Sequence, residues 1–258
     1  MTYEFVLEFW KKLNIKNADE LASALEAYSV NFAYNSGKIE NEEITYHDTR
    51  EIFDNNGVTS YTGSTKTLFE IQNSKTAYER ILTAFDEKQA VTEDFVKEVQ
   101  MKLTNGTYDK RRYQIGERPG EYKHHDFVTG KNEVGAAVED VKEELCELLD
   151  ELNDIDDKNA LVAAAYFHAK FENIHPFSDG NGRVGRLIMN YILLIHNHPP
   201  ITVYEEDRKE YYSALEKFDE ELDLNFLIDF LKSQSVKTWE KQIEKSTKKS
   251  SLSDFINN

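Results

Sequence analysis

A glycine-rich stretch between two helical segments constrains this chain more than any other feature. Residues 175–186 read H-P-F-S-D-G-N-G-R-V-G-R and contain three of the eleven glycines of the chain. Residues 159–173 and 183–196, on either side, place apolar residues at helical spacings. Pro176 cannot continue the first helix, and it biases His175 towards an extended backbone. The sequence therefore predicts a glycine-built turn that opens the second helix.

The turn Gly180-Asn181-Gly182 has the composition of an anion-binding helix N-terminus. Backbone N–H groups at the start of a helix lack partners within the helix, and the helix dipole is positive there. Phosphate is the natural ligand for such a position. Arg183 and Arg186 are three residues apart, so they are neighbours on the first helical turn, and guanidinium groups match phosphate oxygens.

Two further side chains of the stretch add metal and acid-base chemistry. Asp179 precedes the turn and offers a carboxylate oxygen to a Mg²⁺ ion that bridges phosphate oxygens. His175 has an ordinary pKa near neutrality, so it can take a proton from a hydroxyl group. Together these residues predict phosphoryl or nucleotidyl transfer. The simpler interpretation is a structural turn, with His175 as a core histidine and the arginines as surface charges.

Residues 175–186 resemble the signature of the Fic family, H-P-F-x-[DE]-G-N-G-R-x-x-[RK], and agree with it at every defined position. The resemblance implies an α-helical enzyme that transfers AMP from ATP to a protein hydroxyl and releases pyrophosphate. It implies that His175 is the general base, that Asp179 holds Mg²⁺, and that Arg186 takes the γ-phosphate. The residues it assigns to nucleotide binding are Gly180, Asn181, Gly182, Arg183, Gly185, Arg186, Tyr211 and Tyr212.

Tyr211 and Tyr212 are assigned to the nucleotide site only by this resemblance. A P-P-I-T run at residues 199–202, then a charged stretch and Tyr211-Tyr212, is similar to the segment that lines the adenine pocket in Fic enzymes. Without that resemblance, both tyrosines are most simply core aromatics. Asp219 stands where the family often has an asparagine, so Asp219 is left out of the expected site.

A second short motif lies far upstream. The run S-G-K-I-E-N from Ser36 to Asn41 matches the inhibitory motif [ST]-x-x-x-E-[GN] of one Fic subclass. The resemblance implies that Glu40 pairs with Arg186 and keeps ATP from binding productively. From the residues alone, Gly37 would end one helix, and Ser36 would cap another that carries Glu40 in its first turn.

Residues 108–130 resist a helical interpretation. Gly116, Pro119 and Gly120 follow a short run, Tyr113-Gln114-Ile115, and residues 122–128 could pair with it, so a β-hairpin is expected. The resemblance makes this hairpin the flap that covers the nucleotide and docks the target segment by strand addition. A surface hairpin without a role is the alternative.

The rest of the chain favours an all-α fold with this small hairpin. Amphipathic helices are expected over residues 18–34, 68–85, 92–103 and 138–152, and helix continues at 225–231. Residues 237–258 form a polar tail that could be partly disordered. The expected organisation is an N-terminal helical region at 1–100, a catalytic core at 101–204 and a C-terminal helical extension at 205–258.

Composition narrows the partners. The net charge of −17 argues against nucleic acid and against an anionic membrane surface as partners. One cysteine excludes an internal disulfide and a thiolate metal cluster. No secretory signal and no span long enough for a bilayer are visible, so a soluble cytoplasmic protein is expected. Apolar helix faces in the extensions could support a homodimer.

The function predicted from the sequence is therefore Mg²⁺-dependent AMP transfer from ATP to a serine, threonine or tyrosine hydroxyl of a protein, restrained by Glu40. Self-modification would be one form of it. Within the same class, Glu40 could instead orient a water molecule that removes AMP, which would make a de-AMPylase or a two-way enzyme. The alternative from another class is a nucleotide-binding module without catalysis, which would be free to lose the His175 and Asp179 that this chain has.

Overall fold

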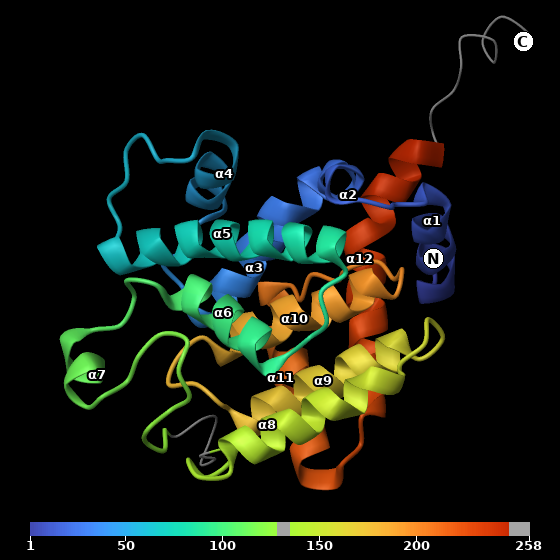
Figure 1. Ribbon diagram of the computed structural model, residues 1–258. Helices are drawn as coiled ribbons and strands as arrows, with labels where there is room; N and C mark the ends of the chain where they lie inside the picture. The colour runs from blue at the N-terminus through green and yellow to red at the C-terminus, as the bar shows by residue number, and fades with distance from the viewer. Residues whose placement is uncertain (128–134, 248–258) are drawn as a thin grey trace, which may run out of the picture.

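The computed structural model describes residues 1–127 and 135–247, and all regular elements in these ranges are helices (Figure 1). The all-α prediction is confirmed. In chain order the elements are α1 (Tyr3–Leu13), α2 (Ala18–Ala24), α3 (Glu26–Glu40), α4 (Tyr46–Asn55), α5 (Thr65–Glu87), α6 (Glu93–Thr104), α7 (Lys110–Gln114), α8 (Val141–Asp150), η1 (Glu151–Asp154), α9 (Ala160–Ile174), α10 (Asn181–Ile195), η2 (Glu205–Asp207), α11 (Arg208–Glu221) and α12 (Asn225–Thr247).

Helix α10 forms the centre of the core. Thirteen of its fifteen residues are buried, because α9 packs along one side and α3, α5 and α6 pack against the others. Two polar side chains inside this packing have hydrogen-bond partners. Asn190 donates to the Ile201 carbonyl at 2.9 Å and accepts from the Ile201 N–H at 2.6 Å, and the Tyr191 hydroxyl donates to the Ala84 carbonyl at 3.0 Å. The later turns of α10 are therefore tied to the segments that pack beside them.

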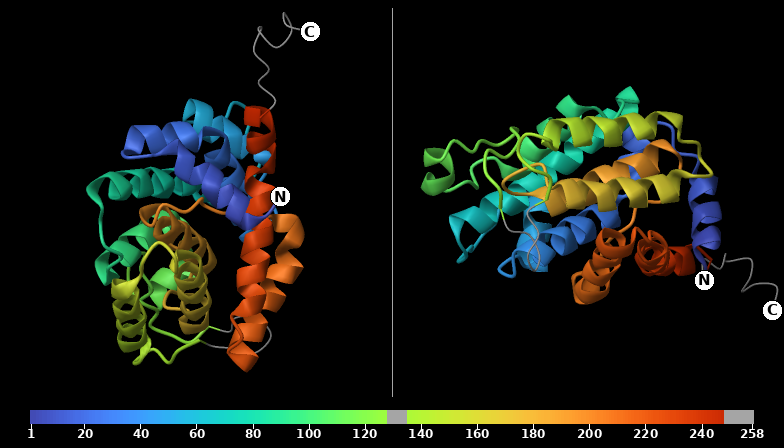
Figure 2. Two further views of the ribbon diagram at one scale, coloured as in Figure 1. Left: turned by 90° about the vertical axis from the view of Figure 1, so that its right-hand side faces the viewer. Right: turned by 90° about the horizontal axis from the view of Figure 1, so that it is seen from below.

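The two ends of the chain pack against each other. Figure 2 shows α12 as a long helix along one side of the molecule, beside α11 and the N-terminus. Trp239 of α12 is 1 % exposed and lies between Trp10 at 5.1 Å and Tyr28 at 5.9 Å, measured between ring centroids. The predicted polar tail is thus wrong for residues 237–247, where apolar residues at helical spacing extend α12. Residues 248–258 lie outside the described part.

Replacing Trp239 with alanine is expected to lower the free energy of unfolding by about 3 to 5 kcal/mol, because it leaves a cavity between the two ends of the chain. Urea denaturation followed by circular dichroism measures this. Lys241→Ala, an exposed neighbour on the same helix, is the control and should change the free energy of unfolding by less than about 0.5 kcal/mol. A Trp239→Ala protein as stable as that control would contradict the packing role.

The region predicted as one helix over residues 18–34 is two helices, α2 and α3, which meet at Leu25. The second continues past the point where the residues alone suggested an end. Gly37 lies inside α3. A Cβ atom there would come within 2.7 Å of the Ile44 side chain, so glycine allows the following segment to pack closely. Glu40 is consequently the last residue of α3, and the first-turn position considered for it is wrong.

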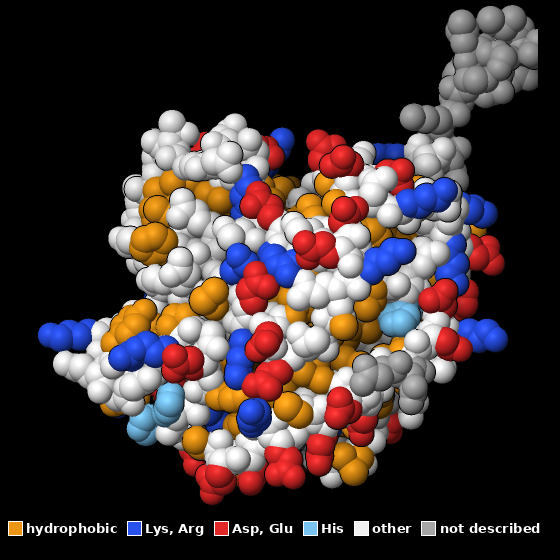
Figure 3. Space-filling view, viewed as in Figure 1, with side chains coloured by type: hydrophobic (Ala, Val, Ile, Leu, Met, Phe, Trp, Pro, Cys, Tyr) orange, Lys and Arg blue, Asp and Glu red, His pale blue; other side chains and the backbone are white. Residues whose placement is uncertain are grey.

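The predicted β-hairpin is also wrong where the structure describes it. Tyr113 and Gln114 belong to the short helix α7, and Ile115 is its C-cap. This helix starts at Asp109, whose side chain accepts the Arg112 N–H at 2.8 Å. Residues 122–127 form no strand, and residues 128–130 lie outside the described part. Helix α7 projects from the body of the molecule, and basic and hydrophobic side chains gather there (Figures 1 and 3).

The remaining helices agree with the sequence. The segments predicted over residues 68–85, 92–103, 138–152, 159–173 and 183–196 are α5, α6, α8, α9 and α10, with ends that differ by a few residues. Gly106, which follows α6, has a φ of 72°, as expected of a glycine that ends a helix. In residues 1–127 and 135–247, no helix is long and apolar enough to cross a membrane.

Candidate active site

The loop between α9 and α10 is fixed by hydrogen bonds to its own backbone and to α6. Asn181 is 2 % exposed and bonds twice to Phe177, accepting its N–H at 3.0 Å and donating to its carbonyl at 2.7 Å. Gln100 of α6 donates to the Asp179 carbonyl at 2.9 Å. The loop is therefore preorganised, and the side chain of Asn181 shapes the loop instead of facing outward.

His175 ends α9 in a left-handed conformation. Its φ is 51° and its ψ is 62°, so the extended backbone expected before Pro176 is wrong. The reason is the helix end: the His175 N–H donates to the Phe171 carbonyl at 3.0 Å, which closes the last turn of α9. This turn also sends the chain back so that the Pro176 carbonyl accepts the Lys123 N–H at 2.9 Å.

The imidazole of His175 is uncharged at neutral pH. Burial, and to a lesser extent the nearby Lys123 ammonium, lower its pKa to about 4. A neutral imidazole has a free lone pair and can accept a proton, which a protonated histidine cannot. The position at the start of the glycine loop thus carries a group with the chemistry of a general base.

The first turn of α10 needs glycine at two positions. Gly180 has a φ of 85°, and a Cβ atom there would come within 2.8 Å of Thr104, so the turn into the helix excludes larger residues. At Gly182, a Cβ atom would collide with the Glu40 carboxylate and with Arg186. The carboxylate therefore lies directly over the N-terminal turn, where the sequence predicts an anion. Gly185 faces away from this turn, against His168 of α9.

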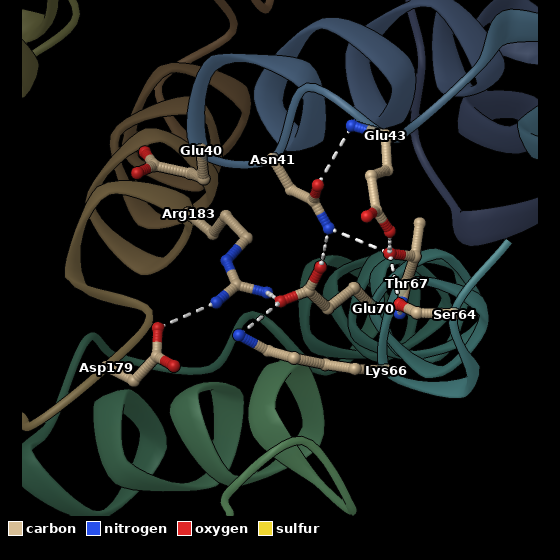
Figure 4. Close-up of a pocket in the computed structure, with 9 residues that line it drawn as sticks. All are labelled: Glu40, Asn41, Glu43, Ser64, Lys66, Thr67, Glu70, Asp179 and Arg183. Atoms are coloured by element: carbon tan, nitrogen blue, oxygen red, sulfur yellow. Dashed lines mark hydrogen bonds and ion pairs between the residues drawn. The ribbon is translucent and has the colours of Figure 1, made fainter.

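Arg183 lies between two carboxylates. Its guanidinium is 5 % exposed and contacts Asp179 at 3.0 Å and Glu70 of α5 at 3.7 Å, as Figure 4 shows. The Nε atom of Arg183 is buried and has no hydrogen-bond partner among the described residues. A second guanidinium, that of Arg112 in α7, lies 3.7 Å from Asp179. This end of the loop is thus rich in charged groups of both signs.

Arg186 is the most buried charge of the loop, with 1 % of its side chain exposed. It donates to the Glu40 carboxylate at 2.7 Å, to the Ser36 hydroxyl at 3.0 Å and to the Ser36 carbonyl at 2.9 Å. All three acceptors belong to the last two turns of α3. The structure thus brings Ser36 and Glu40 together with Arg186 across 146 to 150 residues of chain.

The tyrosine pair divides into one buried and one open side chain. Tyr211 is 1 % exposed, and its hydroxyl bonds to His168 at 2.7 Å and accepts from Arg186 at 3.3 Å. Tyr211 therefore contacts Arg186 within the protein interior, and it has no exposed surface for an adenine ring. Tyr212 is 47 % exposed, so of the two only Tyr212 has surface to offer a ligand.

The residues Tyr113, Gln114 and Ile115, predicted as a flap, are exposed on α7, and no contact joins them to His175 in the described part of the chain. The neighbour that does reach the loop from α7 is Arg112, through Asp179. The flap assignment for these three residues is therefore not supported by their place in the fold.

The sequence interpretation missed two carboxylates beside the site. Glu70 lies in α5, which was predicted from the spacing of its apolar residues alone. Glu172 lies one turn before His175 on α9, and burial raises its pKa to about 8 although Arg186 opposes this change. The three-residue spacing from His175 on a helix could have pointed to Glu172. No comparable signal marks Glu70.

A pocket of about 380 Å³ opens beside the loop, a size in the range of small-ligand sites. It lies between the end of α3, the start of α5 and the start of α10 (Figure 4). The residues that line it are Glu40, Asn41, Glu43, Ser64, Lys66, Thr67, Glu70, Asp179 and Arg183. In residues 1–127 and 135–247, no group of three or more histidine, cysteine or acidic side chains is arranged to hold a metal ion unaided.

Comparison with known proteins agrees with this site. The family model described as Fic/DOC family matches residues 90–193, which include α6, α9 and the whole glycine loop. Protein adenylyltransferase Fic of Drosophila persimilis is 41 % identical over 75 residues, which are 29 % of this chain and 15 % of that protein. The chain thus spans a small part of the curated relatives that it matches.

Solved structures extend the similarity over nearly the whole fold. A Fic domain containing signaling protein from Bacteroides thetaiotaomicron aligns with a TM-score of 0.80 and 24 % identity, over 96 % of this chain and 97 % of that chain. Fic-1 from C. elegans aligns with a TM-score of 0.70 and 22 % identity, over 95 % of this chain and 73 % of that chain. At these identities the alignments establish the fold.

Proposed function

Because residues 90–193 form a Fic domain, we propose that this protein is an adenylyltransferase that moves AMP from ATP to a hydroxyl side chain of a protein. The observation that carries the proposal is the geometry of one loop. A neutral histidine, an acidic residue and two arginines surround the N-terminal turn of α10. The naming of the similar proteins as protein adenylyltransferases supports the same chemistry.

In the proposed reaction, the triphosphate lies against the first turn of α10, whose N–H groups and dipole favour negative charge. His175 takes the proton of the target hydroxyl, and the oxygen forms a bond to the α-phosphorus of ATP. The bond between that phosphorus and the β-phosphate oxygen breaks, and pyrophosphate leaves. Arg183 and Arg186 stabilise the charge on the departing phosphates.

Asp179 fits a magnesium ion that arrives with ATP. Its carboxylate is 20 % exposed beside the pocket, and it is a hard oxygen donor. Magnesium in nucleotide sites is commonly held by one or two carboxylates and by the phosphates themselves, so a single aspartate is sufficient. When bound, the ion would neutralise phosphate charge. Asp179 would then exchange its contact with Arg183 for the metal, which would free Arg183 for phosphate.

Glu40 restrains this reaction in the proposal. Its carboxylate occupies the Arg186 guanidinium and lies over Gly182, where the phosphates would have to lie. Two negative groups at one helix N-terminus repel each other, so ATP either binds elsewhere or displaces Glu40. The resting enzyme would therefore be slow, and a signal that moves α3 would activate it.

The rate of AMP transfer is expected to change little between pH 6 and pH 8 and to fall as the pH drops towards 4. The pKa of His175 is lowered to about 4, so the base form is present throughout the neutral range and is lost only when the imidazole is protonated near pH 4. Initial rates of the Glu40→Gly protein, with folding checked by circular dichroism at each pH, measure this. A midpoint near 6.5, the ordinary histidine value, would contradict a buried neutral base.

ATP labelled on different phosphates tests the reaction type. Incubation of the protein with Mg²⁺ and ATP labelled at the α-phosphate should leave label on protein, and ATP labelled at the γ-phosphate should leave none. Self-modification serves as the reporter, because it needs no known target. Label from the γ-phosphate on the protein would show that the reaction is phosphoryl transfer and not AMP transfer. ATP binding without transfer of either label would favour a non-catalytic module.

A second candidate reaction follows from the position of Glu40. Because its carboxylate lies over the phosphate turn, it could hold a water molecule that attacks an AMP-modified side chain. Hydrolytic removal of AMP would then need Glu40, whereas AMP transfer would be restrained by it. Release of AMP from a modified protein, measured for the wild type and for Glu40→Gly, separates the two reactions.

A further inference from the structure

We propose that Asn41 and Glu70 form a latch that holds Glu40 on Arg186. In this arrangement Glu70 is a positioning residue: it acts on the phosphate-binding loop through the end of α3 and, directly, through Arg183. The inference rests on the proposed function, since it names the structural element that keeps the inhibitory carboxylate in place.

The latch begins one residue after Glu40. Asn41 is the C-cap of α3, and its amide donates to the Glu70 carboxylate at 2.6 Å and to the Thr67 hydroxyl at 3.0 Å. Its own side-chain oxygen accepts the Glu43 N–H at 2.9 Å. Figure 4 shows the two bonds of the amide group reaching the first turns of α5. The end of α3 is thus tied to α5 by a side chain adjacent to the inhibitory residue.

Glu70 is the fixed half of the latch. Its side chain is 6 % exposed, and α5, on which it lies, is 23 residues long and packs against α2, α3, α4, α6 and α10. A carboxylate in such surroundings needs its hydrogen bonds, because leaving a buried charged acceptor without a donor is costly. The Asn41 amide supplies the shortest of these contacts. The bond therefore favours the position of α3 in which Glu40 reaches Arg186.

The second oxygen of Glu70 connects the latch to the phosphate site. It lies 3.7 Å from the Arg183 guanidinium and 3.6 Å from the Lys66 ammonium. The Glu70 carboxylate thus contacts Arg183 with one oxygen and accepts a hydrogen bond from Asn41 with the other. Both arginines of the loop are restrained by the same pair of helices, Arg186 through Glu40 and Arg183 through Glu70.

The isosteric substitution Asn41→Asp tests the latch. It keeps the oxygen that accepts the Glu43 N–H, but it replaces the amide donor by a carboxylate facing Glu70. We expect AMP transfer to rise about tenfold, the change that loss of one charge-assisted hydrogen bond produces. In the Glu40→Gly background the same substitution should change the rate by less than about twofold, because no inhibitory carboxylate remains to be released.

Thr45→Ala is the matched control. It removes the N-cap bond to the Asp48 N–H, which is 3.1 Å long, at an exposed residue just after the latch whose hydroxyl bonds to Asp48. This variant should transfer AMP at the wild-type rate. Hydrogen exchange of backbone amides 37–41 gives a readout independent of activity: it should be faster in Asn41→Asp and unchanged in Thr45→Ala. Asn41→Ala replaces Asn41→Asp if the aspartate lowers the folded fraction.

Three outcomes would overturn the latch. One is a wild-type rate in Asn41→Asp while Glu40→Gly is active. Another is an equal increase in both backgrounds, which would place Asn41 outside the inhibitory device. The third is unchanged exchange at residues 37–41. If Glu40→Gly itself transfers no AMP, the proposed function fails, and the exchange measurement alone then decides whether the latch exists.

Discussion

Replacing Glu40 with glycine is expected to raise the rate of AMP transfer about 10- to 100-fold. The substitution removes the acceptor that Arg186 contacts at 2.7 Å and clears the space over Gly182. A charge-assisted hydrogen bond in a buried site contributes about 1.5 to 3 kcal/mol, and each 1.4 kcal/mol corresponds to a factor of ten. Intact-mass measurement of self-modification over time gives the two rates.

Glu42→Gly is the matched control for this substitution. Glu42 is two residues further along, is 78 % exposed and pairs with Arg208 on the surface, so it shares the glycine substitution but not the contact with the loop. Its rate should equal that of the wild type within about twofold. Equal rates for wild type and Glu40→Gly would contradict autoinhibition, and a similar increase in Glu42→Gly would assign the effect to loosening of the chain after α3.

Loss of the His175 imidazole is expected to have the opposite and larger effect. In the Glu40→Gly background, His175→Ala should lower the rate about 100- to 10,000-fold, the contribution typical of a positioned general base. Binding of ATP should remain within a few-fold, because the side chain acts on the target hydroxyl and the phosphates contact other residues. Isothermal titration of the non-hydrolysable ATP analogue separates the two effects.

His196→Ala controls for the general loss of a histidine. His196 is the C-cap of the same helix α10 and pairs weakly with Asp157 at 3.7 Å, far along the helix from the loop. Its rate should match the parent protein. If His175→Ala keeps more than about a tenth of the parent rate, the proton is removed by another group, and the assignment of His175 as the base is wrong.

Local sequence patterns predicted the scaffold of the site well. The helices on either side of the loop follow from apolar spacing, and Gly180 and Gly182 marked a turn whose first residue needs a left-handed backbone. Such features are decided by a few neighbouring residues, so a sequence shows them directly. Glu40 and Arg186, in contrast, are 146 residues apart, and their pairing was predicted only from the resemblance to the family's inhibitory motif.

The sequence misled where tertiary packing overrode local preference. Gly37 was expected to end a helix, but it lies inside α3, where the absence of a Cβ atom lets Ile44 pack closely. Residues 237–247 look polar, yet Trp239 anchors them against Trp10 and Tyr28 in the N-terminal part of the chain. Tyr211 was expected beside adenine, and the structure buries it behind Arg186. The places of Trp239 and Tyr211 depend on partners that are distant in sequence.

Glu70 shows the same limit at the site itself. Nothing near it in the sequence indicates that it contacts Arg183, because that contact arises only when α5 and α10 pack together. A carboxylate on a long amphipathic helix is usually a solvated surface charge. The exposed fraction of its side chain, 6 %, is what reveals a specific role.

One time course of three proteins with Mg²⁺ and ATP, followed by intact mass, tests His175-dependent transfer and its restraint by Glu40 together: wild type, Glu40→Gly, and Glu40→Gly with His175→Ala. We predict slow gain of one AMP unit by the wild type, faster gain by Glu40→Gly, and none by the double variant. Equal gain by wild type and Glu40→Gly, or continued gain by the double variant, would contradict a His175-dependent transfer that Glu40 restrains.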